Sequence, residues 1–222
     1  MKKKKAQKLP ETILPIKCKD KGFQERWYEG RSLLNIPHSF RAIFAGPPSC
    51  GKSNFTKNII IRADPPFEQI LITHFSSHDT NEWSDVDCEM LDHIPHSHEI
   101  STEGKKLLII EDLDLKSLSK PELHNLDRLF GYCSSHKSLS IILTCQDPYN
   151  VPPCGRRTAN VFVFFKQPDI IALATLAKRT GMKANDLLEI FCKYIHSPHD
   201  SLMIDYTNGT PAPLRINGFT KI

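Results

Sequence analysis

Short apolar runs recur along the chain from residue 38 onward, and charged or turn-forming residues bound each of them. Apolar runs of about four to eight residues are typical of strands that are buried on both faces of a sheet. Five segments fit this pattern: Arg41–Gly46, Gln69–Phe75, Lys106–Glu111, Ser138–Thr144 and Val161–Lys166. We predict a strand in each of them, whereas residues 76–104 predict loops with short structured pieces.

Amphipathic stretches at helical spacing lie between and after these strands. Helices are predicted over Ser53–Ile61, from Ser119 to Cys133, over Asp169–Arg179 and over Asn185–Tyr194. Ser119 and Glu122 form a capping box with Pro121 in the first turn, which fixes where the second helix begins. Two later runs, Ser201–Tyr206 and Leu214–Asn217, predict a C-terminal pair of strands. The alternation of strands and helices predicts an α/β fold with a mostly parallel sheet and helices on both faces.

Composition divides the chain into a basic tail with a lead-in, residues 1–37, and one domain, residues 38–222. Residues 1–37 are polar, charged and interrupted by prolines. Residues 1–32 contain ten Lys or Arg and four Asp or Glu, which is +6, so −2 remains for the rest of a chain of net charge +4. The lysines from Lys2 to Lys5, together with Lys8, fit a nuclear-import signal, an arm that contacts nucleic-acid phosphates, or a solvated tail.

The same composition argues against membrane and secreted classes. No apolar run approaches the roughly 20 residues that span a bilayer, and no apolar stretch follows the first lysines, so we expect neither a membrane partner nor secretion. The seven cysteines are scattered and form no CxxC pair, which favours free thiols in a reducing compartment.

The strongest chemical signal is the segment GPPSCGKS, Gly46 to Ser53, which fits G-x-x-x-x-G-K-[ST] between a predicted strand and a predicted helix. Glycines at the fixed positions let backbone N–H groups approach phosphate oxygens, and the N-terminus of the following helix favours the same anion. Lys52 would place a positive charge between the β- and γ-phosphates of ATP, and the Ser53 hydroxyl would ligate Mg²⁺. The predicted nucleotide-binding residues are Gly46, Pro47, Pro48, Ser49, Cys50, Gly51, Lys52, Ser53 and Asn54.

Two acids, Glu111 and Asp112, follow the apolar residues of the third predicted strand. A magnesium–nucleotide site needs one carboxylate near the metal and a second group that activates water. By position we assign Glu111 to Mg²⁺ and Asp112 to the catalytic base, with Asp114 as the alternative base. The usual order in hydrolytic ATPases is Asp then Glu, so this pair is reversed.

The strand that ends in the two acids is third in the chain. This implies that a later strand is inserted between it and the first strand, which leads into the phosphate-binding segment. The predicted sheet order is therefore 5-1-4-3-2. The end of the fourth strand then lies beside the γ-phosphate. Gln146 stands there, where its amide either contacts the γ-phosphate and water or caps the strand. The following residues, Asn150 to Arg157, predict a loop stiffened by prolines.

Arg156 and Arg157 close that proline-containing stretch. An arginine delivered to a neighbouring subunit would offset transition-state charge in a ring ATPase. Arg156 and Arg157 are the candidates, with Arg179 in reserve. The other roles that fit them are solubility and contact with DNA.

Four segments together resemble the viral genome-packaging ATPases of the FtsK/HerA superfamily, of the poxvirus type also found in virophages and Maverick/Polinton-like elements. They are IFAGPPSCGKSN, LLIIEDLD, SIILTCQDPYNVPP, and SLMIDYTNG followed by LRING, and they span roughly residues 40–218. The resemblance implies a P-loop NTPase fold and a homo-oligomeric ring that uses ATP to thread double-stranded DNA into a preformed capsid. It also implies contact with capsid proteins, and a location in the host nucleus, a cytoplasmic viral factory or the virion.

Two other functions remain open from the residues. A small-molecule kinase would use a mobile lid rich in arginine, but residues 112–140 contain only Arg128. A DNA-binding or capsid-associated adaptor would bind nucleotide without turnover.

Overall fold

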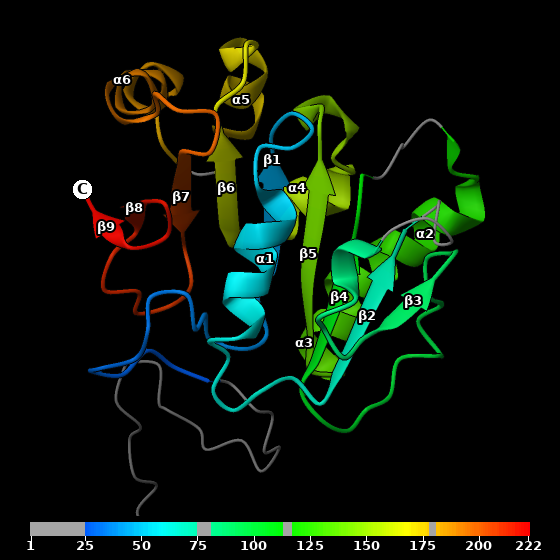
Figure 1. Cartoon of the computed structure of the whole chain (residues 1–222). Helices are drawn as coiled ribbons and strands as arrows, with labels where there is room; N and C mark the ends of the chain where they lie inside the picture. The colour runs from blue at the N-terminus through cyan, green and yellow to red at the C-terminus, as the bar shows by residue number, and fades with distance from the viewer. Residues whose placement is uncertain (1–24, 75–80, 113–116, 178–180) are drawn as a thin grey trace, which may run out of the picture.

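The computed structural model describes residues 25–74, 81–112, 117–177 and 181–222, and within these ranges nine strands form one sheet (Figure 1). The strands are β1 (Arg41–Ala45), β2 (Gln69–Thr73), β3 (Glu89–Leu91), β4 (Lys106–Ile110), β5 (Leu139–Cys145), β6 (Val161–Phe165), β7 (Ser201–Asp205), β8 (Leu214–Ile216) and β9 (Thr220–Lys221). The sheet order is β3-β2-β4-β5-β1-β6-β7-β8-β9.

The five predicted parallel strands occupy the order β2-β4-β5-β1-β6, which confirms the predicted arrangement 5-1-4-3-2. Strand β1 pairs in parallel with β5 and with β6, and β4 pairs in parallel with β2 and with β5. Strand β7 pairs antiparallel with β6 and with β8, which confirms the C-terminal strand pair. The edge strands β3 and β9 were not predicted, because three and two residues are too few for a sequence pattern.

The helices are α1 (Lys52–Ile60), α2 (Lys120–Arg128), α3 (Ser134–His136), α4 (Pro153–Thr158), α5 (Ile170–Ala177) and α6 (Ala184–Tyr194). Short turns of other helical types are η1 (Asn81–Trp83), η3 (Leu129–Cys133) and η4 (Pro148–Asn150). The predicted capping box is present at the start of α2, where the Ser119 hydroxyl accepts from the Glu122 backbone N–H. The helix predicted to run on to Cys133 is instead α2 followed by the π-helical turn η3.

The stretch from Asn150 to Arg157 is not the loop that the prolines predicted. Residues 153–158 form α4, and its N-terminal boundary is set by Pro152 and Pro153. Proline is well tolerated in a first helical turn, where its missing N–H has no helical partner in any case. Arg156 and Arg157 therefore lie in the last turn of a helix.

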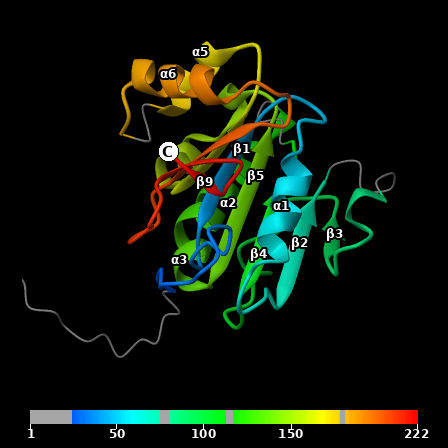
Figure 2. The same cartoon turned by 60° about the vertical axis from the view of Figure 1, so that its left-hand side comes forward.

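Two hydrophobic cores lie on opposite faces of the sheet, because successive side chains of a strand point to opposite sides. Phe44 of β1 packs in the same core as Phe55 of α1, with their ring centroids 5.4 Å apart. Its neighbour Ile43 belongs to the other core, with Leu126 of α2. Figure 2 shows α1 on one face of the sheet and α2 with α3 on the other. Both views place α5 and α6 together, and Figure 1 shows them near the end of β6.

The described part of the lead-in, residues 25–37, packs on the sheet. Leu34 and Ile36 are buried in the core that contains α1. The Trp27 indole Nε1 donates to the Thr207 hydroxyl at 2.7 Å, and the buried Arg215 guanidinium is paired with Asp205 beside it. Among the helices of the described ranges, none has both the length and the apolar character needed to cross a bilayer.

Candidate functional site

The predicted phosphate-binding loop, residues 46–53 and called the phosphate loop below, follows β1. Its two fixed glycines are required for different physical reasons. At Gly46 a Cβ atom would stand 2.6 Å from Phe165 Cβ and 2.8 Å from Cys50 Sγ, so there is no room for a side chain. At Gly51 the φ angle is +105°, a left-handed conformation that glycine adopts without strain. Gly51 then leads into α1, where no side chain caps the first turn. Free backbone N–H groups at a helix N-terminus attract anions.

Lys52 crosses the mouth of this loop. Its ammonium donates to the carbonyl oxygens of Gly46 at 2.9 Å and Pro47 at 3.0 Å. The side chain is buried, and Nζ lies 3.9 Å from Asp112 Oδ1 on the strand-end side. The loop thus holds a cation between its own backbone and the acidic pair.

A cleft of about 320 Å³ brings the loop and the acids together. Its walls come from the loop, from the first turn of α1 and from the carboxyl ends of β2, β4 and β5. The lining residues are Pro48, Ser49, Gly51, Lys52, Ser53, Asn54, His74, Glu82, Glu111, Asp112 and Thr144. Of the predicted nucleotide-binding residues, Gly46, Pro47 and Cys50 lie outside this lining, but Gly46 and Pro47 hold Lys52 through their carbonyls.

Glu111 and Asp112 are adjacent in sequence, yet both carboxylates reach this cleft. Neighbouring residues of a regular strand would point to opposite faces. Here the strand ends at Ile110, and Asp112 has a φ angle of +44°, which breaks the alternation. The backbone N–H of Asp112 donates to the Thr144 hydroxyl at 3.1 Å, which ties the turn to the end of β5.

The two carboxylates have different surroundings. Glu111 is only 7% exposed, and its Oε2 accepts from the Trp83 indole at 3.0 Å. Burial raises the pKa of Glu111 above its ordinary value, and the Trp83 hydrogen bond opposes that rise. The Asp112 side chain is 45% exposed. Glu111 is therefore the desolvated acid of the pair, and Asp112 the one in contact with solvent.

Gln146 lies beside Asp112, at the end of β5. Its Nε2 donates to Asp112 Oδ2 at 3.1 Å, while the other carboxylate oxygen faces Lys52. The structure thus brings Gln146 to the acidic pair, as its place after the fourth predicted strand requires. The alternative base Asp114 lies outside the described residues.

Arg156 and Arg157 are not brought to this cleft. They are followed in α4 by Thr158, whose carbonyl accepts from Arg41 Nε at 2.7 Å. Arg41 is the first residue of β1, so this end of α4 lies at the start of that strand. The phosphate loop leaves the opposite end of β1, about 13 Å away at about 3.3 Å per residue. Arg156 is half-buried and Arg157 is exposed. The reserve candidate Arg179 lies outside the described residues.

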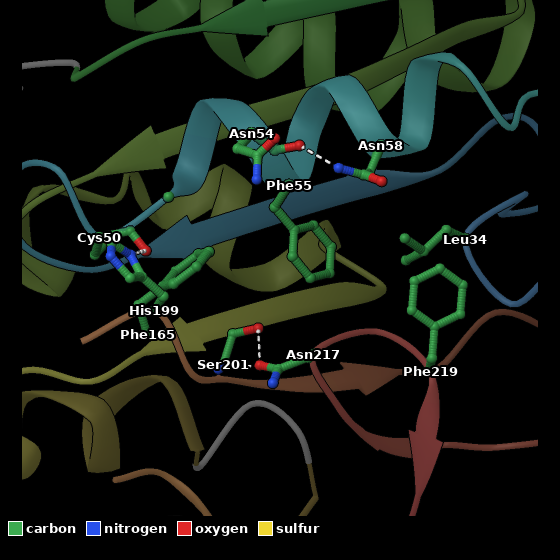
Figure 3. Close-up of a pocket in the computed structure, with 11 residues that line it drawn as sticks. Leu34, Cys50, Asn54, Phe55, Asn58, Phe165, His199, Ser201, Asn217 and Phe219 are labelled. Carbon is green, nitrogen blue, oxygen red and sulfur yellow. Dashed lines mark hydrogen bonds between the residues drawn. The ribbon is translucent and has the colours of Figure 1, made fainter. Parts of the chain in front are cut away.

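A second cavity, of about 220 Å³, lies on the other side of the first turn of α1 (Figure 3). Its lining residues are Leu34, Cys50, Gly51, Asn54, Phe55, Asn58, Phe165, His199, Ser201, Asn217 and Phe219. Gly51 and Asn54 line both cavities. In Figure 3, Phe219 and Leu34 lie at one end of the cavity, and His199 with Phe165 at the other. His199 Nδ1 donates to the Cys50 carbonyl at 3.2 Å.

Sequence reasoning missed several of these lining residues. His74 directly follows β2, and Thr144 is the last residue but one of β5, and these two strands flank β4. The rule that ligands gather at the carboxyl ends of parallel strands could have found both residues. Glu82 lies in the segment predicted as loops, where no pattern marks it. The same holds for Trp83, which does not line the cleft but bonds Glu111. The second cavity combines the lead-in, α1, β6 and the C-terminal strands, and no local motif connects these segments.

Comparison with known proteins gives a match in structure only. No protein-family model and no curated protein matches the chain. The genome packaging NTPase B204 of Sulfolobus turreted icosahedral virus 2, solved with AMPPCP, aligns over 83% of this chain and 98% of its own, with 18% identity and a TM-score of 0.55. The DNA-packaging ATPase B204 of Sulfolobus turreted icosahedral virus aligns over 82% and 97%, with 14% identity and a TM-score of 0.56.

A protein outside the packaging group has a similar structure. The pCW3 conjugation coupling protein TcpA, solved with ATPγS, aligns over 85% of this chain and 61% of its own, with 12% identity and a TM-score of 0.56. At these identities the likeness concerns the fold. Together with the mostly parallel sheet and the loop between β1 and α1, it shows that this chain has a P-loop NTPase fold.

Proposed function

We propose that this chain is an ATP-hydrolysing motor that moves double-stranded viral DNA into a preformed capsid. The observation that carries the proposal is the single cleft that joins Lys52 and Ser53 of the phosphate loop to Glu111 and Asp112. Phosphate binding needs only the loop, whereas hydrolysis also needs acidic groups beside the γ-phosphate. Packaging as the task is favoured by the two packaging NTPases that share this fold.

The two cavities together accommodate the two parts of a nucleotide. Because Gly51 and Asn54 line both, a nucleotide with its phosphates in the loop would place its base and ribose in the second cavity. The aromatic rings there offer apolar surface for a base, and the side-chain amides offer hydrogen bonds. Nucleoside pockets combine an apolar lining with a few polar groups in this way.

The cleft also fits Mg²⁺, which prefers oxygen ligands. The Ser53 hydroxyl and the Glu111 carboxylate both line it, and we assign these two residues to hold the ion. When bound, Mg²⁺ would neutralise charge on the β- and γ-phosphate oxygens. Lys52 adds a positive charge fixed by the carbonyls of Gly46 and Pro47.

Asp112 is the proposed base that takes a proton from the attacking water. Its carboxylate is partly exposed and lies between Lys52 and Gln146, so water can reach it. The exposed Gln146 amide holds one Asp112 oxygen, and from there we propose that it orients water or contacts the γ-phosphate.

A ring of identical subunits would explain where Arg156 and Arg157 act. Neither lies in the cleft of its own chain, as expected for residues that serve a neighbour's site. We propose that one of them reaches the γ-phosphate of the adjacent subunit. The ring would enclose double-stranded DNA and dock on capsid proteins in the host nucleus, a cytoplasmic viral factory or the virion.

Replacing Lys52 with Ala tests the catalytic part of this proposal. Phosphate release from ATP should be lost, because the loop would no longer carry its charge to the γ-phosphate. Unchanged release from the Lys52→Ala protein would contradict the proposal. ATP binding by the wild-type protein without turnover would indicate an adaptor, and transfer of phosphate to an added nucleoside would indicate a kinase.

A further inference from the structure

The segment from Asn81 to Val86 folds over α1 and reaches the acidic pair. Trp83 is its buried residue, at 3% exposure, and its indole Nε1 donates to Glu111 Oε2 at 3.0 Å. An indole nitrogen can only donate a hydrogen bond, and a carboxylate can only accept one when ionised. In this contact the indole N–H therefore donates and Glu111 Oε2 accepts.

Other contacts hold the Trp83 ring in place from the side of α1. The Lys57 ammonium lies 5.5 Å from the ring centroid. The same ammonium donates to the Glu82 carbonyl and forms an ion pair with Asp85. The backbone N–H of Val86 closes the turn by donating to the Trp83 carbonyl at 3.0 Å. Trp83 is thus clamped between the helix that follows the phosphate loop and the strand that carries the acids.

We propose that Trp83 is a positioning residue for Glu111. By holding Oε2, the indole fixes the orientation of a buried carboxylate whose other oxygen is then available to the cleft. A carboxylate that serves a metal is commonly oriented by such a neighbouring donor, and loss of that donor costs about 10- to 100-fold in metal affinity or activity. The inference rests on the proposed function, because it gives Glu111 its role at the Mg²⁺–nucleotide site.

Trp83→Phe isolates the hydrogen bond, because phenylalanine keeps an aromatic ring in the core but has no N–H. We expect kcat for ATP hydrolysis to fall about 10- to 100-fold, because Glu111 would no longer be held in its orientation at the Mg²⁺ site. The gain in ADP affinity that Mg²⁺ produces should shrink by a similar factor, whereas ADP affinity in EDTA should stay the same.

Trp27→Phe is the matched control, because the chain has two tryptophans. It loses an indole hydrogen bond of the same kind, to Thr207, but lines neither cavity. Its kcat and its Mg²⁺ dependence should equal those of the wild type. In the Trp27→Phe variant Trp83 is the remaining tryptophan, so the tryptophan fluorescence of this variant should change when Mg²⁺ is added to its ADP complex. Glu111→Ala should remove that change.

The outcomes separate this inference from the proposed function. If Trp83→Phe keeps the kcat and the Mg²⁺ dependence of the wild type, the positioning role of Trp83 is overturned. Equal losses of ADP affinity with and without Mg²⁺ would also overturn it, because they would indicate a purely structural role. An emission of Trp83 that ignores Mg²⁺ would overturn it even if Trp83→Phe does not fold. If the wild-type protein binds ADP but does not hydrolyse ATP, the proposed function fails, and the Mg²⁺-dependent affinities of the two variants still decide the role of Trp83.

Discussion

At the scale of single residues, Glu111 and Asp112 differ in burial and in hydrogen-bond partners, and the sequence does not predict this difference. The pair itself was predictable, since two acids directly after an apolar strand are typical of a metal–nucleotide site. Its division of roles depends on the positive φ of Asp112 and on the indole of Trp83, which is 28 residues from Glu111. Such a contact depends on how two segments pack, and no spacing rule contains it.

His38 supplies a test of the buried polar network near the start of β1. The His38 residue is 3% exposed. Its Nε2 donates to the Ser138 carbonyl at 2.8 Å, and its Nδ1 accepts from the Ser140 hydroxyl at 2.8 Å. Burial lowers the pKa of His38 from 6.5 to about 4. In the unfolded chain the His38 ring takes up a proton as pH falls through 6.5. In the folded protein the same ring stays neutral down to about pH 4.

The free energy of unfolding should therefore decrease as pH falls from 6.5 to 4. One group contributes about 1.4 kcal/mol per pH unit in such a window, so the His38 contribution is about 3 kcal/mol. Urea unfolding at several pH values measures it. His38→Gln should be less stable at pH 7 but should show a flatter dependence below pH 6.5. Parallel curves for the two proteins would contradict this account.

At the scale of elements, long apolar segments were predictable and short or tertiary ones were not. The order of the five central strands followed from the position of the acidic strand, third in the chain, and is confirmed. Strand β3 is not predicted from the sequence, because Glu89–Leu91 is too short to show the hydrophobic pattern of a strand. Helix α4 is not predicted from the sequence, because Pro152 and Pro153 are as typical of a loop as of the first turn of a helix.

The close approach of the phosphate loop to β6 gives a prediction for Gly46. A Cβ at this position would meet Phe165 Cβ at 2.6 Å, so Gly46→Ala must displace the loop from β6. Overpacking of this kind costs about 1–3 kcal/mol, and ATP affinity should fall because the loop moves. Gly131→Ala is the control, since nothing lies within 4 Å of its added Cβ.

Urea unfolding and titration with a fluorescent ATP analogue measure the two effects. Gly131→Ala should bind the analogue as the wild type does and be as stable or slightly more stable. Equal stability and affinity in Gly46→Ala and the wild type would mean that the loop does not need this contact.

At the scale of the whole molecule, we propose that the subunits of a ring complete each other's sites. Arg156→Ala and Arg157→Ala subunits, mixed with wild-type subunits, should lower ATP hydrolysis more steeply than dilution alone. Each subunit that lacks the arginine would inactivate the cleft of its neighbour. Arg128→Ala is the control, since Arg128 is exposed on α2. A strictly proportional fall for both variants would assign Arg156 and Arg157 to another role, such as contact with DNA.

We propose that the protein is a nucleotide-hydrolysing motor that acts on double-stranded DNA. The most direct measurement is steady-state phosphate release from ATP with and without double-stranded DNA, together with oligomer mass in the same buffers. We predict Mg²⁺-dependent release that rises with DNA, a ring-sized mass in the presence of nucleotide, and no release from Lys52→Ala. Release that is absent, or that continues in Lys52→Ala, would contradict the account, and release indifferent to DNA would leave an ATPase but not a DNA motor.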